Sequence, residues 1–175
     1  MLRPLTVELL PYDPRWAGQA AVESDRLVIA LEPVVLRIEH IGSTAIPGIH
    51  AKPIIDLLAA VSTLAALDAR RSAFEGLGYA WHGENGLVGR RYCTLSDRAT
   101  GRRRIHLHCF ADGSADIARH LAFRDHLRAR PALAVEYEAI KRACRDRHPH
   151  DSHAYSDCKD DWIRRIEAAA VAALP

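Results

Sequence analysis

Residues 52–61, with the sequence Lys-Pro-Ile-Ile-Asp-Leu-Leu-Ala-Ala-Val, form an almost unbroken apolar run that contains one carboxylate, Asp56. A run of this kind predicts a β-strand buried on both faces, because a strand with one face in water alternates apolar and polar residues. A strand buried on both faces needs other elements packed against both sides of its sheet. We therefore expect helices to flank this strand.

The rest of the chain supplies those helices and more strands. Asp13 and Pro14 are typical of a helix start, and this helix is expected to run to about Leu31. The pattern further predicts a strand at 34–41, a turn at 42–50, a helix from 62 or 63 to about 77, hairpin strands at 87–95 and 103–110, and helices at 114–130, 131–147 and 156–174. This order predicts one α+β (mixed α/β) domain over residues 1–175, with a short mixed β-sheet flanked by helices and a helical C-terminal third.

Composition agrees with a single globular domain. The chain has 175 residues, of which 49% are hydrophobic and 26% charged, and this profile excludes a disordered chain or a disulfide scaffold. No apolar run approaches the roughly 20 residues that span a bilayer, so we expect a cytoplasmic protein with no membrane partner. The four cysteines have no C-x-x-C spacing, and we expect all four to be reduced thiols.

The segment between the first two predicted strands carries Gly42, Ser43 and Thr44. Small residues after a strand let backbone N–H groups and hydroxyls approach an anion closely, which suits a phosphate. The next strand brings Asp56 alongside, and a carboxylate beside a bound phosphate is a common ligand of Mg²⁺. A Ser/Thr helix cap beside a structural aspartate would give the same pattern, so the residues alone leave both readings open.

Several motifs together resemble the GrpB family. The resemblance runs from about residue 7 to residue 169 and rests on His40-Ile-Gly-Ser-Thr-Ala-Ile-Pro-Gly48, Lys52-Pro-Ile-Ile-Asp56, Arg104-x-His106-x-His108, Phe123-Arg124-Asp125, Arg128 and Tyr155-x-x-x-Lys159. It implies a nucleotidyltransferase-like fold, that of the DNA polymerase β catalytic domain. It also implies a functional link to dephospho-coenzyme A kinase, to which a GrpB domain is joined in some bacteria. The family is largely uncharacterised, so the resemblance implies a fold more than an activity.

In the nucleotidyltransferase superfamily, a Gly-Gly or Gly-Ser pair holds nucleotide phosphates, and an acid-x-acid pair on the next strand binds two Mg²⁺ ions. Gly42-Ser43 resembles the first part of this pattern, and Asp56 resembles the first acid, which makes it the candidate catalytic residue. Leu58 stands where the second acid belongs, and leucine cannot ligate a metal. The sequence leaves open whether Glu39 or Asp125 takes its place.

Two histidines lie on the strand where the superfamily has its third acid. His106 and His108 are two residues apart on a predicted strand, so their side chains face the same side of the sheet. With Asp56 they could ligate one metal ion, and this set suits Zn²⁺, Mn²⁺ or Fe²⁺ better than Mg²⁺. Structural histidines held by hydrogen bonds are the alternative. The expected cofactor is therefore a divalent metal, Mg²⁺ or Mn²⁺ by the superfamily pattern and Zn²⁺ by the histidine set.

The distribution of cations suggests an anionic ligand. Residues 70–130 hold twelve basic and six acidic side chains, most of the cations being arginines, whose planar guanidinium suits phosphate. The candidate phosphate-binding residues are Gly42, Ser43, Thr44, Lys52, Arg91, Arg124 and Lys159. Solvated positions are expected for Arg102, Arg103, His148, His150 and His153. No Phe or Tyr stacking pattern interleaves with the basic residues, so nucleic acid is not an expected partner.

Three functional hypotheses follow. The first is a protein that binds a nucleotide or phosphorylated small molecule and transfers a nucleotidyl group to a small acceptor in a metal-dependent reaction. The second is a catalytically degenerate accessory module that keeps only the phosphate pocket. The third is a hydrolase that holds a transition metal on Asp56, His106 and His108. Because Leu58 replaces an expected acid, the sequence leaves open whether the protein is an enzyme.

Overall fold

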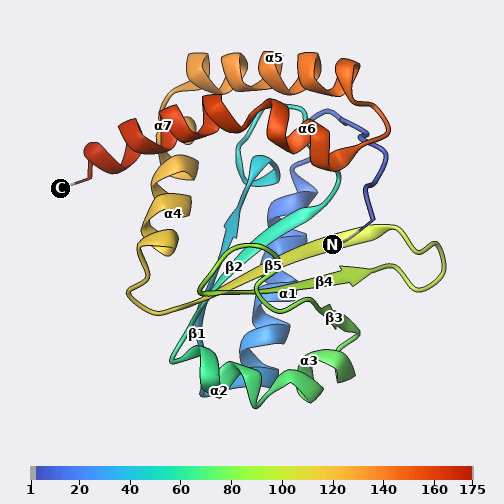
Figure 1. Ribbon diagram of the computed structural model, residues 1–175, viewed down its shortest axis with the longest axis vertical. Helices are drawn as coiled ribbons and strands as arrows, with labels where there is room; N and C mark the ends of the chain where they lie inside the picture. The colour runs from blue at the N-terminus through green and yellow to red at the C-terminus, as the bar shows by residue number, and fades with distance from the viewer. Residues whose placement is uncertain (1–2, 175) are drawn as a thin grey trace.

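The computed structural model describes residues 3–174, which are built around a five-stranded mixed sheet (Figure 1). The strands are β1 (Val35–Ile41), β2 (Ile55–Val61), β3 (Tyr79–Trp81), β4 (Arg90–Ser96) and β5 (Arg103–Ala111). Their order in the sheet is β1-β2-β5-β4-β3. β2 and β5 are parallel, and the other neighbouring pairs are antiparallel. The predicted mixed sheet is confirmed, and β2 lies inside it.

Helices cover both faces of the sheet, as the buried strand requires. The helices of the described chain are α1 (Arg15–Leu31), η1 (Ser43–Ala45, a 3-10 turn), α2 (Leu64–Asp68), α3 (Arg71–Gly76), α4 (Ala115–Arg128), α5 (Pro131–Arg147), α6 (Ser152–Cys158) and α7 (Asp160–Ala172). Figure 1 shows α5, α6 and α7 at one end of the molecule, α2 and α3 at the other, and α4 along one side between them. The predicted α+β architecture with a helical C-terminal third is confirmed. Among the helices within residues 3–174, none combines the length and the apolar character that crossing a bilayer requires.

β2 is as deeply buried as its sequence predicts. Leu57 and Leu58 have no exposed surface. Their side chains point to opposite faces of the sheet, where Leu57 packs in the same core as Leu27 of α1 and Leu58 packs with Ile117 of α4. Asp56 lies on the same face as Leu58, at the beginning of the strand, and its side chain keeps 28% of its surface exposed.

Three element predictions differ from the structure. The helix predicted from residue 62 or 63 to 77 is two short helices, α2 and α3, of which α2 begins after Thr63, whose hydroxyl accepts a hydrogen bond from Ala66 N. β3 was not predicted because its three residues are too few to show an alternation. The helix predicted at 156–174 is α6 and α7. α6 begins at Ser152 because the Asp151 carboxylate caps it by accepting hydrogen bonds from two backbone N–H groups.

The prediction of four reduced thiols is wrong for two of them. Cys144 of α5 and Cys158 of α6 form a disulfide, with Cα atoms 5.8 Å apart. The loop after α5 reverses the chain so that α6 packs against α5, and this packing brings together two cysteines separated by 14 residues. No short sequence motif predicts a disulfide between two cysteines that helix packing brings together. Cys93 and Cys109 are free and buried in the sheet.

Candidate functional site

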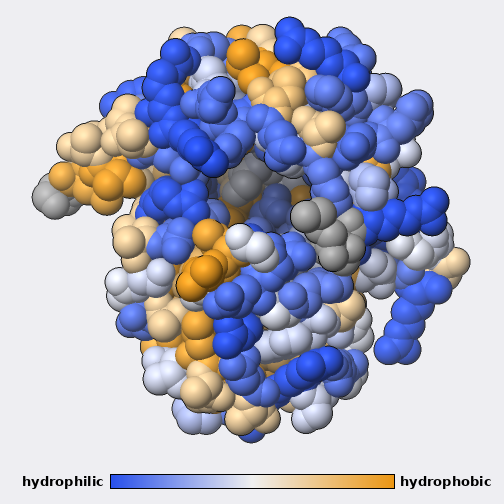
Figure 2. Space-filling view, in the orientation of Figure 1, coloured by the Kyte–Doolittle hydropathy of each residue, from blue (hydrophilic) through white to orange (hydrophobic). Residues whose placement is uncertain are grey.

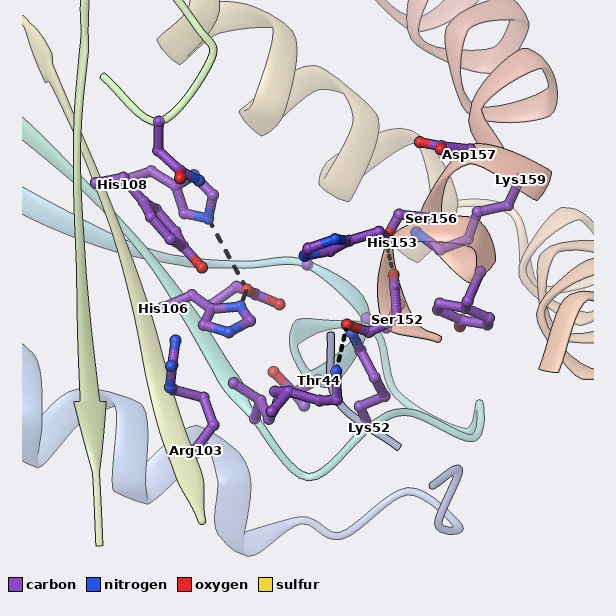
Figure 3. Close-up of a pocket in the computed structure, with 18 of the residues that line it drawn as sticks. Thr44, Lys52, Arg103, His106, His108, Ser152, His153, Ser156, Asp157 and Lys159 are labelled. Carbon is purple, nitrogen blue, oxygen red and sulfur yellow. Dashed lines mark hydrogen bonds and ion pairs between the residues drawn. The ribbon is translucent and has the colours of Figure 1, made fainter. Parts of the chain in front are cut away.

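A cavity of about 820 Å³ opens between the end of β1, the beginning of β2 and helix α6 (Figure 3). The residues that line it are Arg3, Leu5, Gly42, Ser43, Thr44, Lys52, Ile54, Asp56, His82, Asn85, Gly86, Tyr92, Arg103, His106, His108, Tyr137, Ser152, His153, Tyr155, Ser156, Asp157 and Lys159. Figure 2 shows the same region as a hollow whose rim is mostly hydrophilic. The cavity therefore gathers two predicted motifs, Gly42-Ser43-Thr44 and Lys52 to Asp56, and adds a third from α6.

Gly42 lies directly against Asp56. Gly42 has φ of +70°, and a Cβ atom built on it would lie 2.5 Å from Asp56 Oδ2 and 2.9 Å from Asp56 Cβ. Both distances are shorter than real contacts of a Cβ atom, and the second involves an atom that cannot swing away. A glycine is therefore required for the two motifs to form one wall of the cavity.

Asp56 is bound by both predicted histidines. His106 Nδ1 lies 3.0 Å from Asp56 Oδ1, and His108 Nε2 lies 3.9 Å from the same oxygen. They meet because β2 and β5 are parallel in a register that pairs Asp56 with His106 and Leu58 with His108. Burial by itself raises the pKa of Asp56, but the hydrogen bonds from the two imidazoles outweigh it and hold this pKa well below its usual range. Asp56 is therefore ionised, while burial lowers the pKa of His108 and favours its neutral form.

The two-magnesium site of the superfamily does not fit this wall. Mg²⁺ takes oxygen ligands, whereas the immediate partners of Asp56 are imidazoles, and Leu58 is packed in an apolar cluster. Glu39 and Asp125 do not replace the missing acid, because each forms an ion pair of 2.8 Å with Arg124 and neither lines the cavity.

A single transition-metal ion fits this wall by donor type only. One carboxylate oxygen and two imidazole nitrogens are ordinary ligands of Zn²⁺, Mn²⁺ and Fe²⁺. However, within residues 3–174 no group of three or more His, Cys, Asp or Glu side chains is arranged to hold an ion. In this structure Asp56 is hydrogen-bonded to His106 and lies 3.9 Å from His108, and the role of the three residues as metal ligands stays a prediction.

The opposite wall carries two lysines, here called the lysine pair, Lys52 and Lys159. Their ammonium nitrogens lie 5.4 Å and 5.1 Å from the centre of the Tyr155 ring, in cation–π contact. Neither lysine forms an ion pair of 4.0 Å or less, or a side-chain hydrogen bond, within the part of the chain that the structure describes. Burial lowers the pKa of both lysines, and the nearby charge of Asp56 opposes that effect.

A third lysine stands behind this wall. Lys141 of α5 has only 1% of its surface exposed, and its ammonium donates a hydrogen bond to the carbonyl of His50 and lies 4.8 Å from the centre of the Tyr137 ring. Burial, together with the charge of Lys159, lowers the pKa of Lys141 to about 7. All three lysines of the chain therefore lie in or behind the helical side of the cavity.

Ser43 and Thr44 line the cavity, as predicted, but they differ in availability. Thr44 is buried, and its hydroxyl is hydrogen-bonded to His40 Nε2 at 2.9 Å. Burial lowers the pKa of His40 to about 4, so this imidazole is neutral. Thr44 therefore anchors the turn to β1, and Ser43 is the better placed hydroxyl for a ligand.

The structure does not bring Arg91 and Arg124 into the cavity. Arg91 pairs in register with Cys109, whereas its neighbour Tyr92 pairs with His108, so the Arg91 side chain belongs to the other face of the sheet. It forms hydrogen bonds of 2.6 Å and 2.8 Å with Asp68. Arg124 also donates to the carbonyl of His40 and thereby ties α4 to β1.

Some cavity residues were not predicted to be there. Arg103 and His153, expected to be solvated, both line the cavity, together with Ser152 and Ser156. Alternation along β5 would place the side chain of Arg104 on the same face as His106. A register shift between Leu95 and Ser96 changes the strand pairing at this point, and Arg103 lines the cavity instead. The α6 residues lie on one face of the helix. The Asp151 cap makes this helix start at Ser152, four residues before the start that the sequence predicted.

Residues 6–169 match the model of a protein family described as "GrpB protein". The chain is 39% identical over 164 residues to UPF0157 protein YqkA of Bacillus subtilis, a match that covers 94% of this chain and 47% of that protein. It is 33% identical over 181 residues to a dephospho-CoA kinase of Mycolicibacterium paratuberculosis, covering 90% of this chain and 44% of that protein. The chain thus spans about half the length of these relatives.

Two solved structures are similar to this one. The crystal structure of conserved protein GrpB from Enterococcus faecalis superposes with a TM-score of 0.87 at 38% identity, covering 94% of this chain and 98% of that chain. The structure of Cid1 in complex with its short product ApU gives a TM-score of 0.53 at 12% identity, covering 75% of this chain and 41% of that chain. The second likeness shows the fold alone, and it confirms the predicted nucleotidyltransferase-like fold. On the family match and the sequence identities, this chain belongs to the GrpB family.

Proposed function

We propose that this protein binds a nucleotide or another phosphorylated small molecule in the cavity, with phosphate held between Gly42-Ser43 and the lysine pair. The observation that carries the proposal is the charge of the lining. Four cations (Arg3, Lys52, Arg103 and Lys159) line the cavity against two carboxylates, Asp56 and Asp157. Partly buried cations without a carboxylate in contact are costly, and an anionic ligand would remove that cost.

The pairing of cations elsewhere in the molecule supports this reading. Arg91 and Arg124, outside the cavity, each contact carboxylates at 2.8 Å or less. By contrast, Lys52, Arg103 and Lys159 have no carboxylate within 4.0 Å in the described residues. The cavity thus gathers three cations without a contacting carboxylate among the described residues, and these are available to a ligand.

The far end of the cavity supports a ligand with a planar part. His82 and Tyr92 line it, with ring centres 5.8 Å apart and ring planes inclined by 38°. Asn85, on the neighbouring loop, adds an amide that can donate and accept hydrogen bonds. A nucleotide combines the two features, a phosphate for the lysine end and a polar ring for this end.

A binding panel tests the proposal. Purified protein would be titrated with ATP, GTP, CTP, UTP and coenzyme A precursors, followed by thermal unfolding and calorimetry. The precursors are included because a relative that contains a similar domain is named dephospho-CoA kinase. We expect at least one ligand to raise the unfolding temperature, since a ligand at 100 times its Kd adds about 2.7 kcal/mol to stability.

Variants locate the binding. Lys52→Met and Lys159→Met each keep the length of the side chain but remove the charge, and we expect each to weaken binding at least tenfold. Arg164→Met is the matched control, because Arg164 is an exposed cation outside the cavity, paired with Asp160. No response of the wild type to any phosphorylated ligand, or equal losses in all three variants, would overturn the proposal.

Nucleotidyl transfer is a second candidate, favoured by one observation. Asp56 faces the cavity from the position of the superfamily's first acid, beside Gly42 and two histidines. A transition-metal ion held by Asp56, His106 and His108 would supply the Lewis acid for such a reaction or for hydrolysis. Incubation with each nucleoside triphosphate and Mn²⁺ or Zn²⁺, with water as the acceptor of the nucleotidyl or phosphoryl group, should then release pyrophosphate or phosphate in the wild type and not in Asp56→Asn. Equal release by the two proteins would exclude a role of this site.

A further inference from the structure

We infer that the lysine pair, and no bound divalent cation, neutralises the phosphate, so that the cavity takes its ligand as a metal-free anion. This inference deepens the proposed function and rests on it. It names the chemical class of the ligand as a phosphate group, as in pyrophosphate or the polyphosphate of a nucleotide, recognised by ammonium groups. It departs from the two-magnesium pattern of the superfamily whose fold the chain shares.

The wall where the superfamily would hold its metal ions has few oxygen ligands to offer a cation. Asp56 Oδ1 is already hydrogen-bonded to His106 at 3.0 Å and lies 3.9 Å from His108 Nε2. The second acid is replaced by Leu58, which is fully buried. The two substitutes that the sequence left open, Glu39 and Asp125, are each ion-paired to Arg124 and do not line the cavity. This donor set offers one carboxylate to a cation that prefers six oxygen ligands.

The lysine pair lies on the wall that faces it. Figure 3 shows Lys52 and Lys159 on the side of the cavity near Ser152 and Ser156, across from His106 and His108. Both ammonium groups lie about 5 Å from the centre of one ring, and burial together with the positive charge of Lys159 lowers the pKa of Lys52, as repulsion between like charges does. Two neighbouring like charges are stabilised by an anion that lies between or beside them, and a phosphate group carries the matching charge and several acceptor oxygens.

Contacts with α5 hold the pair in place. Tyr155 lies in a buried cluster with Cys144 and is tied to α5 through the disulfide at Cys158, next to Lys159. Lys52 follows His50, whose backbone N–H donates to Glu138 Oε2 at 2.9 Å and whose carbonyl accepts from Lys141. The two lysines are therefore positioned by α5 before any ligand arrives, as binding without a bridging cation requires.

Mg²⁺ would compete with the lysine pair for the phosphate. A Mg²⁺ ion on the phosphate would occupy the oxygens that the ammonium groups need and would add two positive charges beside them. On this wall no carboxylate within 4.0 Å of either lysine offsets that repulsion within residues 3–174. Magnesium should therefore weaken binding rather than promote it.

Calorimetry with two probes, inorganic pyrophosphate and ATP, tests the inference. Each probe would be titrated into the full-length protein in EDTA and in Mg²⁺ present in excess over the probe. We expect binding in EDTA, and an affinity at least threefold weaker in excess Mg²⁺. Lys52→Met and Lys159→Met should lose at least tenfold in affinity in EDTA, and Arg164→Met should lose nothing, with folding of all three checked by circular dichroism.

The outcomes separate the two proposals. Binding that is absent in EDTA and restored by Mg²⁺ would overturn this inference and leave the proposed function standing. Binding in EDTA that Lys52→Met and Lys159→Met leave unchanged, in folded protein, would also overturn it. No binding of either probe in both buffers would overturn this inference, and the proposed function as well if the full ligand panel also failed.

Discussion

The two walls of the cavity differ in whether their charges are compensated by other side chains. On the sheet wall, the negative charge of Asp56 is compensated by a hydrogen bond from His106 and by the neighbouring imidazole of His108, 3.9 Å away. On the helical wall, the positive charges of Lys52 and Lys159 face one tyrosine ring and, within residues 3–174, no carboxylate closer than 4.0 Å. The charge on the sheet wall is compensated by side chains of the protein, whereas the charge on the helical wall is compensated only when an anion is bound.

Because of this difference, substitutions on the sheet wall should change the stability of the fold, and substitutions on the helical wall should change the affinity for a ligand. A substitution on the sheet wall removes one partner of a buried polar pair and leaves the other without its hydrogen bond, so the free energy of unfolding falls. Changes that remove uncompensated, partly buried cations relieve desolvation, so stability is kept while ligand affinity falls. The predictions below use this contrast, beginning with the largest expected effect.

Gly42→Ala should damage the sheet wall most. The new Cβ would lie 2.5 Å from Asp56 Oδ2 and 2.9 Å from Asp56 Cβ, and the residue has φ of +70°. We expect a loss of about 3 kcal/mol in the free energy of unfolding, measured by urea denaturation, from overpacking and backbone strain together. Gly48→Ala is the control, since Gly48 has φ of +82° with nothing within 4 Å of its Cβ position. Equal losses in the two variants would show that only the backbone conformation matters.

Asp56→Ala should destabilise the same wall by about 2 kcal/mol, because His106 loses a charged hydrogen-bond acceptor and His108 loses the carboxylate 3.9 Å away. Asp56→Asn keeps an acceptor oxygen for His106 and should cost less than the alanine variant. Chemical denaturation of the two variants at neutral pH measures the difference. If Asp56→Ala were as stable as the wild type, the triad would not be the structural unit that its distances of 3.0 Å and 3.9 Å indicate.

Lys141 should make stability depend on pH. Its pKa is lowered in the folded state to about 7 by burial and by Lys159, so between pH 7 and its unfolded pKa the unfolded chain binds more protons. Stability therefore rises with pH in this window, by up to about 1.4 kcal/mol per pH unit from this group. Urea unfolding at pH 7.0 and 8.5 should show a smaller rise in Lys141→Met than in the wild type. Identical rises would mean that Lys141 stays charged.

Arg91→Met should have the smallest effect. Arg91 pairs with Asp68 near the surface, outside the cavity, so its loss should cost less than about 1 kcal/mol and leave the affinity for pyrophosphate unchanged. Calorimetry and urea unfolding of this variant check both points. A tenfold loss of affinity would restore Arg91 to the ligand site that the sequence first suggested.

The sheet wall could be predicted from sequence, and the helical wall only in part. The apolar run around Asp56 predicted a buried strand, and the two-residue spacing of His106 and His108 predicted a shared face, because both follow from local periodicity. The face of Arg91 and the exposure of Arg103 depend on pairing register and on a register shift, which one strand's sequence does not contain. The disulfide that joins α5 to α6 depends on long-range packing and was likewise out of reach.

Urea unfolding of the wild type and Lys159→Met, each with and without a saturating concentration of pyrophosphate in EDTA, tests the central claim most directly. We expect Lys159→Met to be at least as stable as the wild type without ligand, because an uncompensated, desolvated charge is removed. We expect pyrophosphate to stabilise the wild type and to have little effect on the variant. A variant that is less stable without ligand, yet gains as much from pyrophosphate as the wild type, would contradict the account.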